Sequence, residues 1–381
     1  MTSQQTKVMF IYGTRPETIK LAPVIKELRS DPDFQTIVTV TGQHRQMLDQ
    51  AMDVFGLQAD YDLNVMQENQ TLSGLSQRIL AGLSDIFADC RPDIVLVQGD
   101  TTSVLIGALS AFYHGVKVGH VEAGLRTADK RNPFPEEINR RLAGVIADLH
   151  FAPTAAARGN LVREGIDPST IFITGNSQID ALLSVVDPNL NLPAEVAPRP
   201  GRRTILMTTH RRENLDGALT EIYRAVKKAL VDFPDVDVIF PMHLNPKVRS
   251  VVMEELQLSD RVRLLDPFDY RTMANVMARS YLVLTDSGGL QEEAPSLGVP
   301  VLVTRTNTER PEGIAAGTAR LAGTTEAGVS AALNELLGNA DTYRRMSQAA
   351  NPYGDGKASF RIRKALRYSL GLDQSKPEEY I

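Results

Sequence analysis

The stretch Val8-Met-Phe-Ile-Tyr-Gly-Thr-Arg-Pro-Glu-Thr-Ile-Lys20 joins two kinds of hydrophobic pattern. Residues 8–12 are a continuous apolar run, which is typical of a buried strand. The residues that follow place apolar side chains on one face of a helix, at Ile19, Leu21, Ala22, Ile25 and Leu28. Gly13 permits a tight turn, and Pro16 suits the first helical turn, where its missing N–H costs nothing. The stretch therefore predicts a strand, a turn and a helix.

The same alternation continues along the chain. Further strands are predicted at residues 37–41, 93–97, 116–121, 149–152 and 171–174, with helices over 43–55 and 104–113. It restarts after residue 202, with strands at 204–208, 236–240, 262–265, 281–285 and 299–303 and helices at 219–232, 246–256, 271–278, 289–297 and 326–337. Strands that alternate with helices indicate parallel sheets covered on both faces. The predicted fold class is therefore α/β, with two doubly wound Rossmann-like domains.

A segment with four prolines, residues 187–202, separates the two halves. Because it has no sustained period, it is interpreted as a linker. We expect an N-terminal domain over residues 1–186 and a C-terminal domain over residues 187–357. The last amphipathic stretch, within 358–381, fits either half by its pattern alone.

Composition excludes several classes of protein. The chain has 381 residues, 43% of them hydrophobic, and a net charge of −5. It has no Lys/Arg stripe for nucleic acid, and its single cysteine, Cys90, excludes an internal disulfide or a cysteine-cluster zinc site. No secretory signal and no apolar run of about 18 residues is present. We expect a cytoplasmic protein of about two domains that does not enter a membrane.

Charged residues follow the predicted strands of the first half. In open α/β sheets, ligands bind outside the carboxyl ends of the strands. Arg15 and Lys20 lie beside a helix N-terminus, which favours an anion such as phosphate. Asp100, Glu122 and Glu136 each follow a strand or open a helix, and together they predict a group of carboxylates for acid–base chemistry. Taken alone, Asp100 is more simply interpreted as the N-cap of the next helix.

The second half places a basic cluster and a glycine-rich turn after its strands. His210 and Arg211 follow one strand and suit a pyrophosphate, while His243 fits a ligand contact and a packed histidine equally well. The run Ser287-Gly288-Gly289 leads from a strand into a helix, so its N–H groups favour an anion. Glu293, one turn further, is placed to accept hydrogen bonds from a sugar, and Arg310 adds a cation.

Other site classes are not indicated. The chain has no HExxH metal motif, no GxSxG elbow and no Walker A motif, and its six histidines are scattered. We therefore expect no metal and no bound cofactor.

As a set, the motifs resemble those of the bacterial non-hydrolysing UDP-N-acetylglucosamine 2-epimerases. They extend in order from residue 7 to about residue 365 and comprise Gly13-Thr-Arg-Pro-Glu17, Gln43-His-Arg45, Gly99-Asp-Thr-Thr102, His120-Val-Glu-Ala-Gly-Leu-Arg126, Pro135-Glu-Glu137, His210-Arg-Arg-Glu213, Asp286-Ser-Gly-Gly-Leu-Gln-Glu-Glu293 and Glu309-Arg-Pro-Glu312. The resemblance implies a GT-B-like pair of domains around a central cleft, with the C-terminal helix crossing back to the first domain. It also implies a homodimer that interconverts UDP-GlcNAc and UDP-ManNAc without NAD or metal and supplies UDP-ManNAc for cell-surface polysaccharides.

The resemblance also implies roles for individual residues. Proton transfer would fall to Asp100, Glu122 and Glu136, and His210 would complete the catalytic set. The UDP or sugar would contact Arg15, Lys20, Phe268, Met273, Ser287, Gly288, Gly289, Glu293 and Arg310, with uracil near Phe268 and Met273. Some members of the family bind a second, activating UDP-GlcNAc, at positions that correspond to Gln43, Gln46, Glu136, Arg211 and His243.

Three other functions share part of this pattern. A GT-B glycosyltransferase needs an acceptor site and only one base, whereas this chain has three candidate carboxylates. A hydrolysing epimerase would release free ManNAc and UDP. A regulatory protein that only binds the nucleotide sugar would not need Asp100, Glu122 and Glu136.

Overall fold

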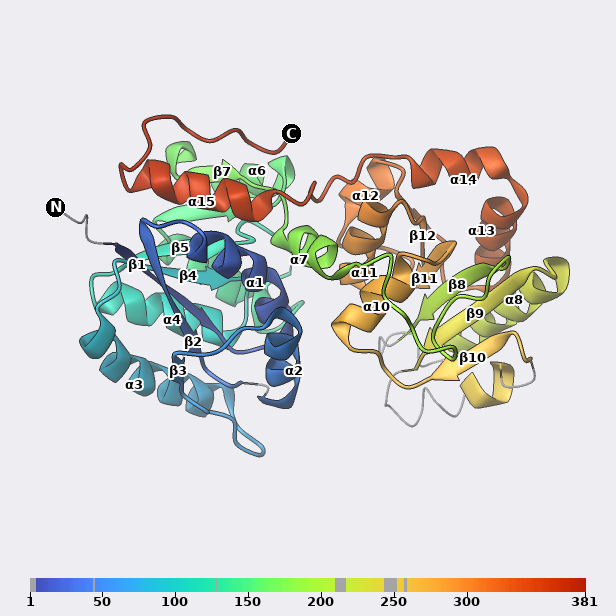
Figure 1. Cartoon of the computed structure of the whole chain (residues 1–381), viewed down its shortest axis with the longest axis horizontal. Helices are drawn as coiled ribbons and strands as arrows, with labels where there is room; N and C mark the ends of the chain where they lie inside the picture. Colours follow the sequence, from blue (N-terminus) through green and yellow to red (C-terminus); the bar gives the residue numbers. More distant parts are fainter. Residues whose placement is uncertain (1–4, 44, 128, 210–216, 243–251, 257–258) are drawn as a thin grey trace. The chain divides into compact units, whose positions relative to one another are not determined.

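The chain divides into two compact units, each built around one sheet (Figure 1). The computed structural model describes residues 5–43, 45–127, 129–209, 217–242, 252–256 and 259–381. Unit 1 comprises residues 1–184 and 354–381, and unit 2 comprises residues 185–353. Because the described strands of both sheets pair in parallel, the predicted α/β class with two parallel sheets is confirmed.

Unit 1 has a seven-stranded sheet with the order β3-β2-β1-β4-β5-β6-β7. Its strands are β1 (Thr6–Tyr12), β2 (Phe34–Val40), β3 (Tyr61–Asp62), β4 (Ile94–Gln98), β5 (Lys117–Val121), β6 (Leu149–Ala152) and β7 (Ile171–Ile173). Its helices are α1 (Arg15–Arg29), α2 (Arg45–Phe55), α3 (Leu72–Cys90), α4 (Thr102–Tyr113), α5 (Glu136–Ile146), α6 (Ala155–Arg163), α7 (Ser177–Val185) and α15 (Ala358–Ser369). The strand order reverses between β1 and β4, so the switch point at which such sheets bind ligands lies there.

Unit 2 repeats this plan with the order β10-β9-β8-β11-β12-β13. Its strands are β8 (Arg203–Thr208), β9 (Val236–Pro241), β10 (Val262–Leu265), β11 (Leu282–Thr285), β12 (Val301–Val303) and β13 (Ala319–Leu321). Its helices are α8 (Ala218–Asp232), α10 (Tyr270–Met277), α11 (Gly288–Glu293), α12 (Pro311–Ala315), α13 (Glu326–Gly338) and α14 (Ala340–Ser347). The switch point of this sheet lies between β8 and β11.

Two predicted helices need comment. The helix expected over 289–297 is α11 followed by a 3-10 turn, Ala294–Leu297, because Pro295 has no N–H for a further α-helical hydrogen bond. The helix expected over 246–256 lies largely outside the described residues.

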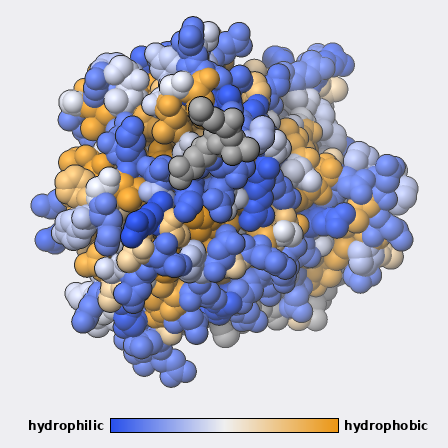
Figure 2. All heavy atoms as spheres, turned by 60° about the vertical axis from the view of Figure 1, so that its left-hand side comes forward, coloured by the Kyte–Doolittle hydropathy of each residue, from blue (hydrophilic) through white to orange (hydrophobic). Residues whose placement is uncertain are grey.

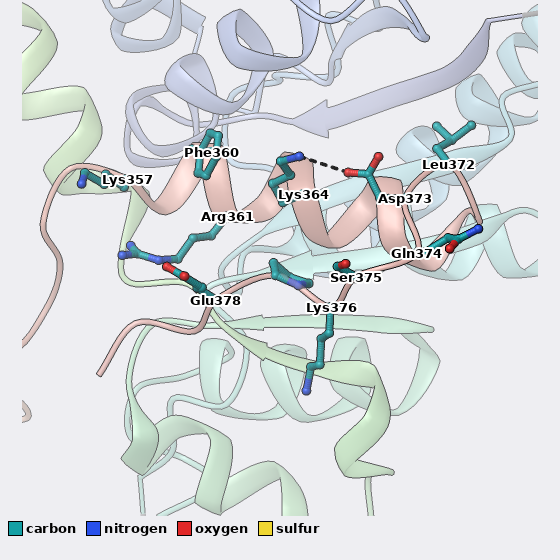
Figure 3. Close-up of a pocket in the computed structure, with 11 residues that line it drawn as sticks. Lys357, Phe360, Arg361, Lys364, Leu372, Asp373, Gln374, Ser375, Lys376 and Glu378 are labelled. Atoms are coloured by element: carbon teal, nitrogen blue, oxygen red, sulfur yellow. Dashed lines mark hydrogen bonds and ion pairs between the residues drawn. The ribbon is translucent and has the colours of Figure 1, made fainter.

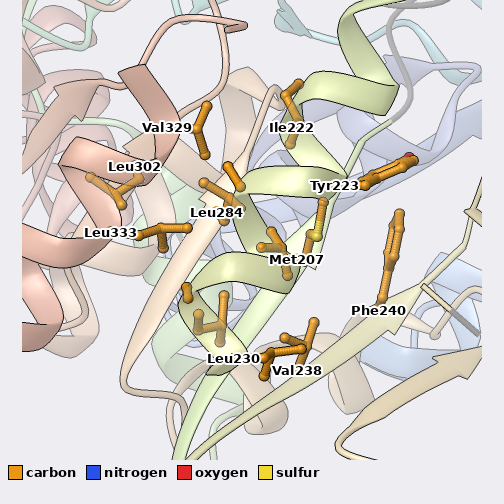
Figure 4. Close-up of a cluster of buried hydrophobic side chains, with 14 of the residues drawn as sticks. Met207, Ile222, Tyr223, Leu230, Val238, Phe240, Leu284, Leu302, Val329 and Leu333 are labelled. Carbon is orange, nitrogen blue, oxygen red and sulfur yellow. The ribbon is translucent and has the colours of Figure 1, made fainter. Parts of the chain in front are cut away.

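The core of unit 2 forms where α8 and α13 cover one face of the sheet. Tyr223 of α8 is fully buried and packs its ring 5.9 Å from that of Phe240 of β9. Met207 and Leu284 from the neighbouring strands and Leu333 from α13 complete the same cluster (Figure 4). Strands buried on both faces are continuous apolar runs, which is why these strands were visible in the sequence.

The last helix, α15, belongs to unit 1. It lies beside α1 (Figure 1), where Arg363 contacts Glu27 at 2.9 Å and Arg367 contacts Asp31 at 2.9 Å. Burial alone would raise the pKa of Asp31, but hydrogen bonds from the Asp33 N–H and from both arginines outweigh it and lower that pKa. The end of the chain is thereby fixed to its beginning.

A pocket of about 690 Å³ lies between α15 and the tail that follows it (Figure 3). Two of its lining residues, Lys364 and Asp373, pair at 3.2 Å, and a third, Arg361, pairs with Asp355 at 2.7 Å. The tail also reaches the edge strand β7, where the Tyr380 N–H donates to the Ile173 carbonyl. The pocket is lined by residues of α15 and of the tail and by none of the predicted site residues. Within the described ranges, no helix has the length and apolar character needed to cross a membrane.

Candidate functional site

Glu122 is the most tightly held of the predicted carboxylates. It follows β5 and is nearly buried, with 7% of its side chain exposed. Its Oε1 accepts hydrogen bonds from Lys20 Nζ at 2.5 Å and Asn176 Nδ2 at 3.1 Å, and its Oε2 accepts from Gln98 Nε2 at 2.5 Å. These donors come from α1, from the segment between β7 and α7, and from β4. Donors from three parts of unit 1 therefore fix the orientation of one carboxylate.

The backbone of Glu122 is strained. Its φ is +63°, in the left-handed region that favours glycine. For an ordinary L-residue this conformation costs about 1–2 kcal/mol. Residues with an unfavourable backbone conformation are concentrated at functional sites, where surrounding contacts hold that conformation in place.

Asp100 lies after β4, on the other side of the switch point from β1. Its Oδ2 pairs with Arg140 NH2 of α5 at 2.5 Å. Burial raises the pKa of Asp100, Arg140 opposes that rise, and the charges of Glu122 and Glu136 add to it. The structure thus places Glu122 and Glu136 within electrostatic reach of Asp100.

The N-cap interpretation of Asp100 is wrong. Thr101 is the N-cap of α4, because its hydroxyl accepts the Val104 N–H at 3.3 Å. A hydroxyl one residue later takes the capping position, so the Asp100 carboxylate is available for Arg140.

Glu136 and Glu137 differ although they are adjacent. Glu136 is half-buried and opens α5. Glu137 is fully buried, pairs with Arg141 at 2.7 Å and accepts the Thr127 N–H at 3.0 Å. Glu137 therefore stabilises the segment before α5, whereas the side chain of Glu136 remains partly exposed to solvent.

The turn after β1 is closely packed. A Cβ on Gly13 would overlap Thr41 Oγ1 and Ser103 Oγ, so only glycine fits there. The Gly13 N–H donates to Glu17 Oε2 at 3.1 Å. Arg15 is half-buried and makes no hydrogen bond or ion pair with the residues that the structure describes. Its guanidinium is therefore not committed to another described side chain.

Several side chains at this edge were not singled out in the sequence. They are Glu17, Gln98, Arg140 and Asn176. Gln98 and Asn176 lie at the ends of β4 and β7, so the strand-end rule that found Asp100 also applies to them. Arg140 is one turn from Glu136 and would have been found by helical spacing.

In unit 2, Arg310 lies over the glycine-rich turn at the start of α11. A Cβ on Gly288 would lie 3.1 Å from Arg310 Cζ, so the absent side chain lets the guanidinium approach the turn. The Nε of Arg310 donates to Glu292 Oε1 at 2.8 Å, which fixes its direction. Glu293 is buried and accepts from the Tyr270 hydroxyl at 2.9 Å. The Ser287 N–H donates to Thr285 Oγ1 at 2.9 Å, so the N–H groups of Gly288 and Gly289 at the start of α11, beside the Arg310 cation, are the ones that suit a phosphate.

Four of the other predicted contacts lie within the described residues. Phe268 precedes α10 and Met273 lies in its first turn, and both are half-buried. Gln43 accepts a hydrogen bond from Ser103 Oγ at 2.8 Å, and Gln46 is exposed on α2. The remaining candidates, His210, Arg211 and His243, lie outside the described residues.

Comparison with known proteins identifies the family. The model of the UDP-N-acetylglucosamine 2-epimerase family matches residues 26–367. The chain is 50% identical to the UDP-N-acetylglucosamine 2-epimerase of Bacillus subtilis over 99% of both chains.

Solved structures agree in sequence and in fold. A crystal structure of a putative UDP-N-acetylglucosamine 2-epimerase from Listeria monocytogenes has a TM-score of 0.94 and 45% identity, over 99% of this chain and 100% of that chain. The enzyme from Neisseria meningitidis, bound to UDP-GlcNAc, has a TM-score of 0.86 and 41% identity, over 95% and 99%.

A more distant match shows the fold alone. The glycosyltransferase SnogD from Streptomyces nogalater is 15% identical with a TM-score of 0.58, over 94% of this chain and 99% of that chain. The fold is therefore GT-B-like, and the resemblance seen in the motifs is confirmed by the full-length relatives. The chain belongs to the UDP-N-acetylglucosamine 2-epimerase family, whose enzymes are isomerases.

Proposed function

We propose that this chain interconverts UDP-GlcNAc and UDP-ManNAc by eliminating UDP and adding it back. The observation that supports the proposal is the group formed by Asp100, Glu122 and Glu136 in unit 1, in which the charges of Glu122 and Glu136 act on Asp100. In this reaction one group removes a proton from one face of C2 and another group delivers a proton to the opposite face. Several carboxylates with different surroundings suit these two tasks.

The chemistry explains the need for more than one acid or base. The C2 proton of GlcNAc is not next to a carbonyl, so its simple removal would leave an unstabilised carbanion. In an elimination, a carboxylate takes the C2 proton while the C1–O bond breaks, and the products are 2-acetamidoglucal and UDP. A second acid then delivers a proton to the other face of C2 while the UDP oxygen returns to C1. Atoms and charge balance without NAD or metal.

Departure of UDP places negative charge on its pyrophosphate. We assign Arg310 and the turn Ser287-Gly288-Gly289 to that charge, because the guanidinium already lies over the turn. Arg15 and Lys20, from unit 1, and His210 are assigned the same task on the grounds of family resemblance. Phe268 and Met273 would then meet the uracil, and Glu293 the sugar hydroxyls.

Proton NMR in D₂O, with only UDP-GlcNAc added, tests this function. We expect a growing UDP-ManNAc anomeric signal, deuterium at C2 and no free ManNAc. Free ManNAc with UDP would instead show a hydrolysing epimerase. Tight binding of UDP-GlcNAc without turnover would show a transferase or a regulatory protein.

A second UDP-GlcNAc is proposed to activate the enzyme. Gln43, Gln46 and Glu136 lie at the positions that bind this activator in similar enzymes, with Arg211 and His243 completing the set. We expect a sigmoidal dependence of rate on UDP-GlcNAc and little turnover of UDP-ManNAc alone, because only UDP-GlcNAc fills both sites. Initial rates from both directions measure this, and hyperbolic kinetics in both would refute activation.

We also propose a homodimer formed through α5. This helix exposes Ile138, Leu142 and Val145 at helical spacing, with Val145 75% exposed. The apolar Phe134 before it is 68% exposed. Figure 2 shows one face of the molecule, on which apolar patches interrupt a mainly hydrophilic surface. A second copy of the chain that covered the exposed apolar side chains of α5 would remove them from water.

The dimer proposal predicts the effect of a charge on α5. Val145→Glu should shift the mass measured by light scattering from dimer to monomer, because it would bury a carboxylate in an apolar interface. Val231→Glu is the matched control, since Val231 is 77% exposed on α8 of unit 2 and should leave the mass unchanged. A dimer that persists in Val145→Glu would place the interface elsewhere.

A further inference from the structure

One buried carboxyl, that of Glu17, connects the two turns at the switch point of unit 1. Glu17 is the third residue of α1 and only 2% exposed. Its Oε2 accepts the Gly13 N–H at 3.1 Å, in the turn after β1. Its Oε1 accepts the Thr101 hydroxyl at 2.8 Å, in the turn after β4. A single side chain therefore spans the two strands between which the sheet reverses its order.

The second of these contacts lies next to the proposed proton-transfer group. Thr101 directly follows Asp100 and is the N-cap of α4. Asp100 itself is held by α5, through Arg140 at 2.5 Å and through Asn139 Nδ2, which donates to the Asp100 carbonyl at 2.9 Å. The turn that carries Asp100 and Thr101 is thus fixed by two elements, by α5 and, through Glu17, by α1.

Helix capping alone does not account for this arrangement. A glutamate at the third position of a helix often reaches back to a backbone N–H, and the contact with Gly13 fits that pattern. Capping needs no partner on a different helix, however, and Thr101 belongs to α4. The link to Thr101 is the additional contact that requires a functional explanation.

We propose that Glu17 is a positioning residue, which holds the Asp100 turn at the distance from the β1 turn that proton transfer requires. This inference rests on the proposed function, since it takes Asp100 as a proton-transfer group. The length of the side chain is then what matters, because the two partners lie on separate strands.

The charge state of Glu17 agrees with a role based on hydrogen-bond geometry. Burial raises the pKa of Glu17 to about 7, although the hydroxyls of Thr14 and Thr101 and the Gly13 N–H act in the opposite direction. The neutral acid is therefore well populated near neutral pH. A neutral group of the same length, such as a glutamine amide, can accept from Gly13 and donate to Thr101.

Two conservative substitutions of Glu17 separate length from charge. Glu17→Gln keeps the length and should retain kcat to within about fivefold, while Glu17→Asp keeps the charge but shortens the reach. Because a misplacement of about 1 Å can cost ~10²-fold in rate, we expect kcat of Glu17→Asp to fall by that order. The KM for UDP-GlcNAc should change little in either variant, because the nucleotide contacts are assigned mainly to unit 2. Equal losses in the two variants, or a smaller loss in Glu17→Asp, would overturn the proposal.

Thr101 provides a second test, which also applies if Glu17→Asp fails to fold. Thr101→Val removes the hydroxyl and should lower kcat, whereas Thr101→Ser keeps it and should restore the rate. Thr101→Val also removes the N-cap of α4, so its melting temperature is measured alongside kcat. In the double variant Glu17→Asp/Thr101→Val, the loss in kcat should be smaller than the sum of the two single losses, since both changes break the link between Glu17 and Thr101. Additive losses would show that the two residues act separately.

The matched control is Glu221, in the first turn of α8, which also accepts a backbone N–H, that of Glu326 at 3.1 Å. Glu221→Asp should leave kcat unchanged. Turnover by the wild-type enzyme in the same NMR assay tests the proposed function separately. An active wild type with active Glu17→Asp would remove only the positioning role, whereas an inactive wild type would remove the proposed function.

Discussion

Replacing Glu122 with glutamine should lower kcat by ~10²–10⁴-fold, which is the range that general acid–base catalysis supplies. A carboxamide cannot take a proton from C2. It also presents an N–H₂ to a place where Lys20, Gln98 and Asn176 all donate, so at least one donor loses its acceptor. The measurement is kcat together with deuterium incorporation at C2, and both should fall in parallel.

The folding effect of this substitution must be separated from the chemical effect. Glu164 offers a control, because it pairs with Arg126 at 2.7 Å in the same unit but has no assigned catalytic task. Glu164→Gln should keep the wild-type kcat. Calorimetric UDP binding and the melting temperature show whether Glu122→Gln is folded, and a folded variant with wild-type turnover would end the assignment of Glu122.

For Asp100→Asn, kcat should likewise fall by ~10²–10⁴-fold. Asparagine keeps the shape of the side chain and an oxygen for Arg140, but it can no longer exchange a proton. Burial and the neighbouring carboxylates raise the pKa of Asp100, so the substitution removes a group whose acid form is favoured by its surroundings. Glu136→Gln is expected to have an effect of the same kind.

The ion pair of Arg202 with Asp237, whose side chain is fully buried, is the control for loss of an Asp–Arg contact. It lies in unit 2 with a separation of 2.5 Å. Asp237→Asn should lower the melting temperature without changing kcat of the folded enzyme. Deuterium exchange then distinguishes the roles of Asp100 and Glu136. A variant that exchanges C2 deuterium but forms no UDP-ManNAc has kept the base and lost the opposite acid. Full activity of Asp100→Asn would contradict its role.

The sheets were predictable from sequence because parallel strands are buried on both faces. β4, for example, is buried along its whole length and appears as a continuous apolar run. β3 has two residues, too few to form a pattern, and exists through its pairing with β2. No element was predicted for α3, although Leu75, Ile79, Leu83 and Ile86 repeat at helical spacing along its buried face.

The site was predictable only where its residues follow strands. Asp100 and Glu122 were found in this way, since strand ends converge at one edge of a parallel sheet. The partners that orient them were not found. Asn176 is 54 residues from Glu122 and Arg140 is 40 residues from Asp100, so their contacts exist only once the chain has folded. The capping error at Asp100 arose because Asp100 and Thr101 are both good N-caps, and sequence alone does not choose between neighbours.

The docking of α15 on α1 has a consequence for synthesis of the protein on the ribosome. Residues 1–184 of unit 1 emerge first, and about 170 residues of unit 2 must follow before the helix that completes unit 1. At 5–20 residues per second, the wait is roughly 10–30 seconds. During that time Asp31 lacks Arg363 and Arg367, and the surface of α1 that α15 covers is exposed to water. The nascent chain thus passes through a stage in which its first domain lacks only α15 and the segment after it, and the surface of α1 can bind other molecules. A chaperone that recognises this surface would act at that stage.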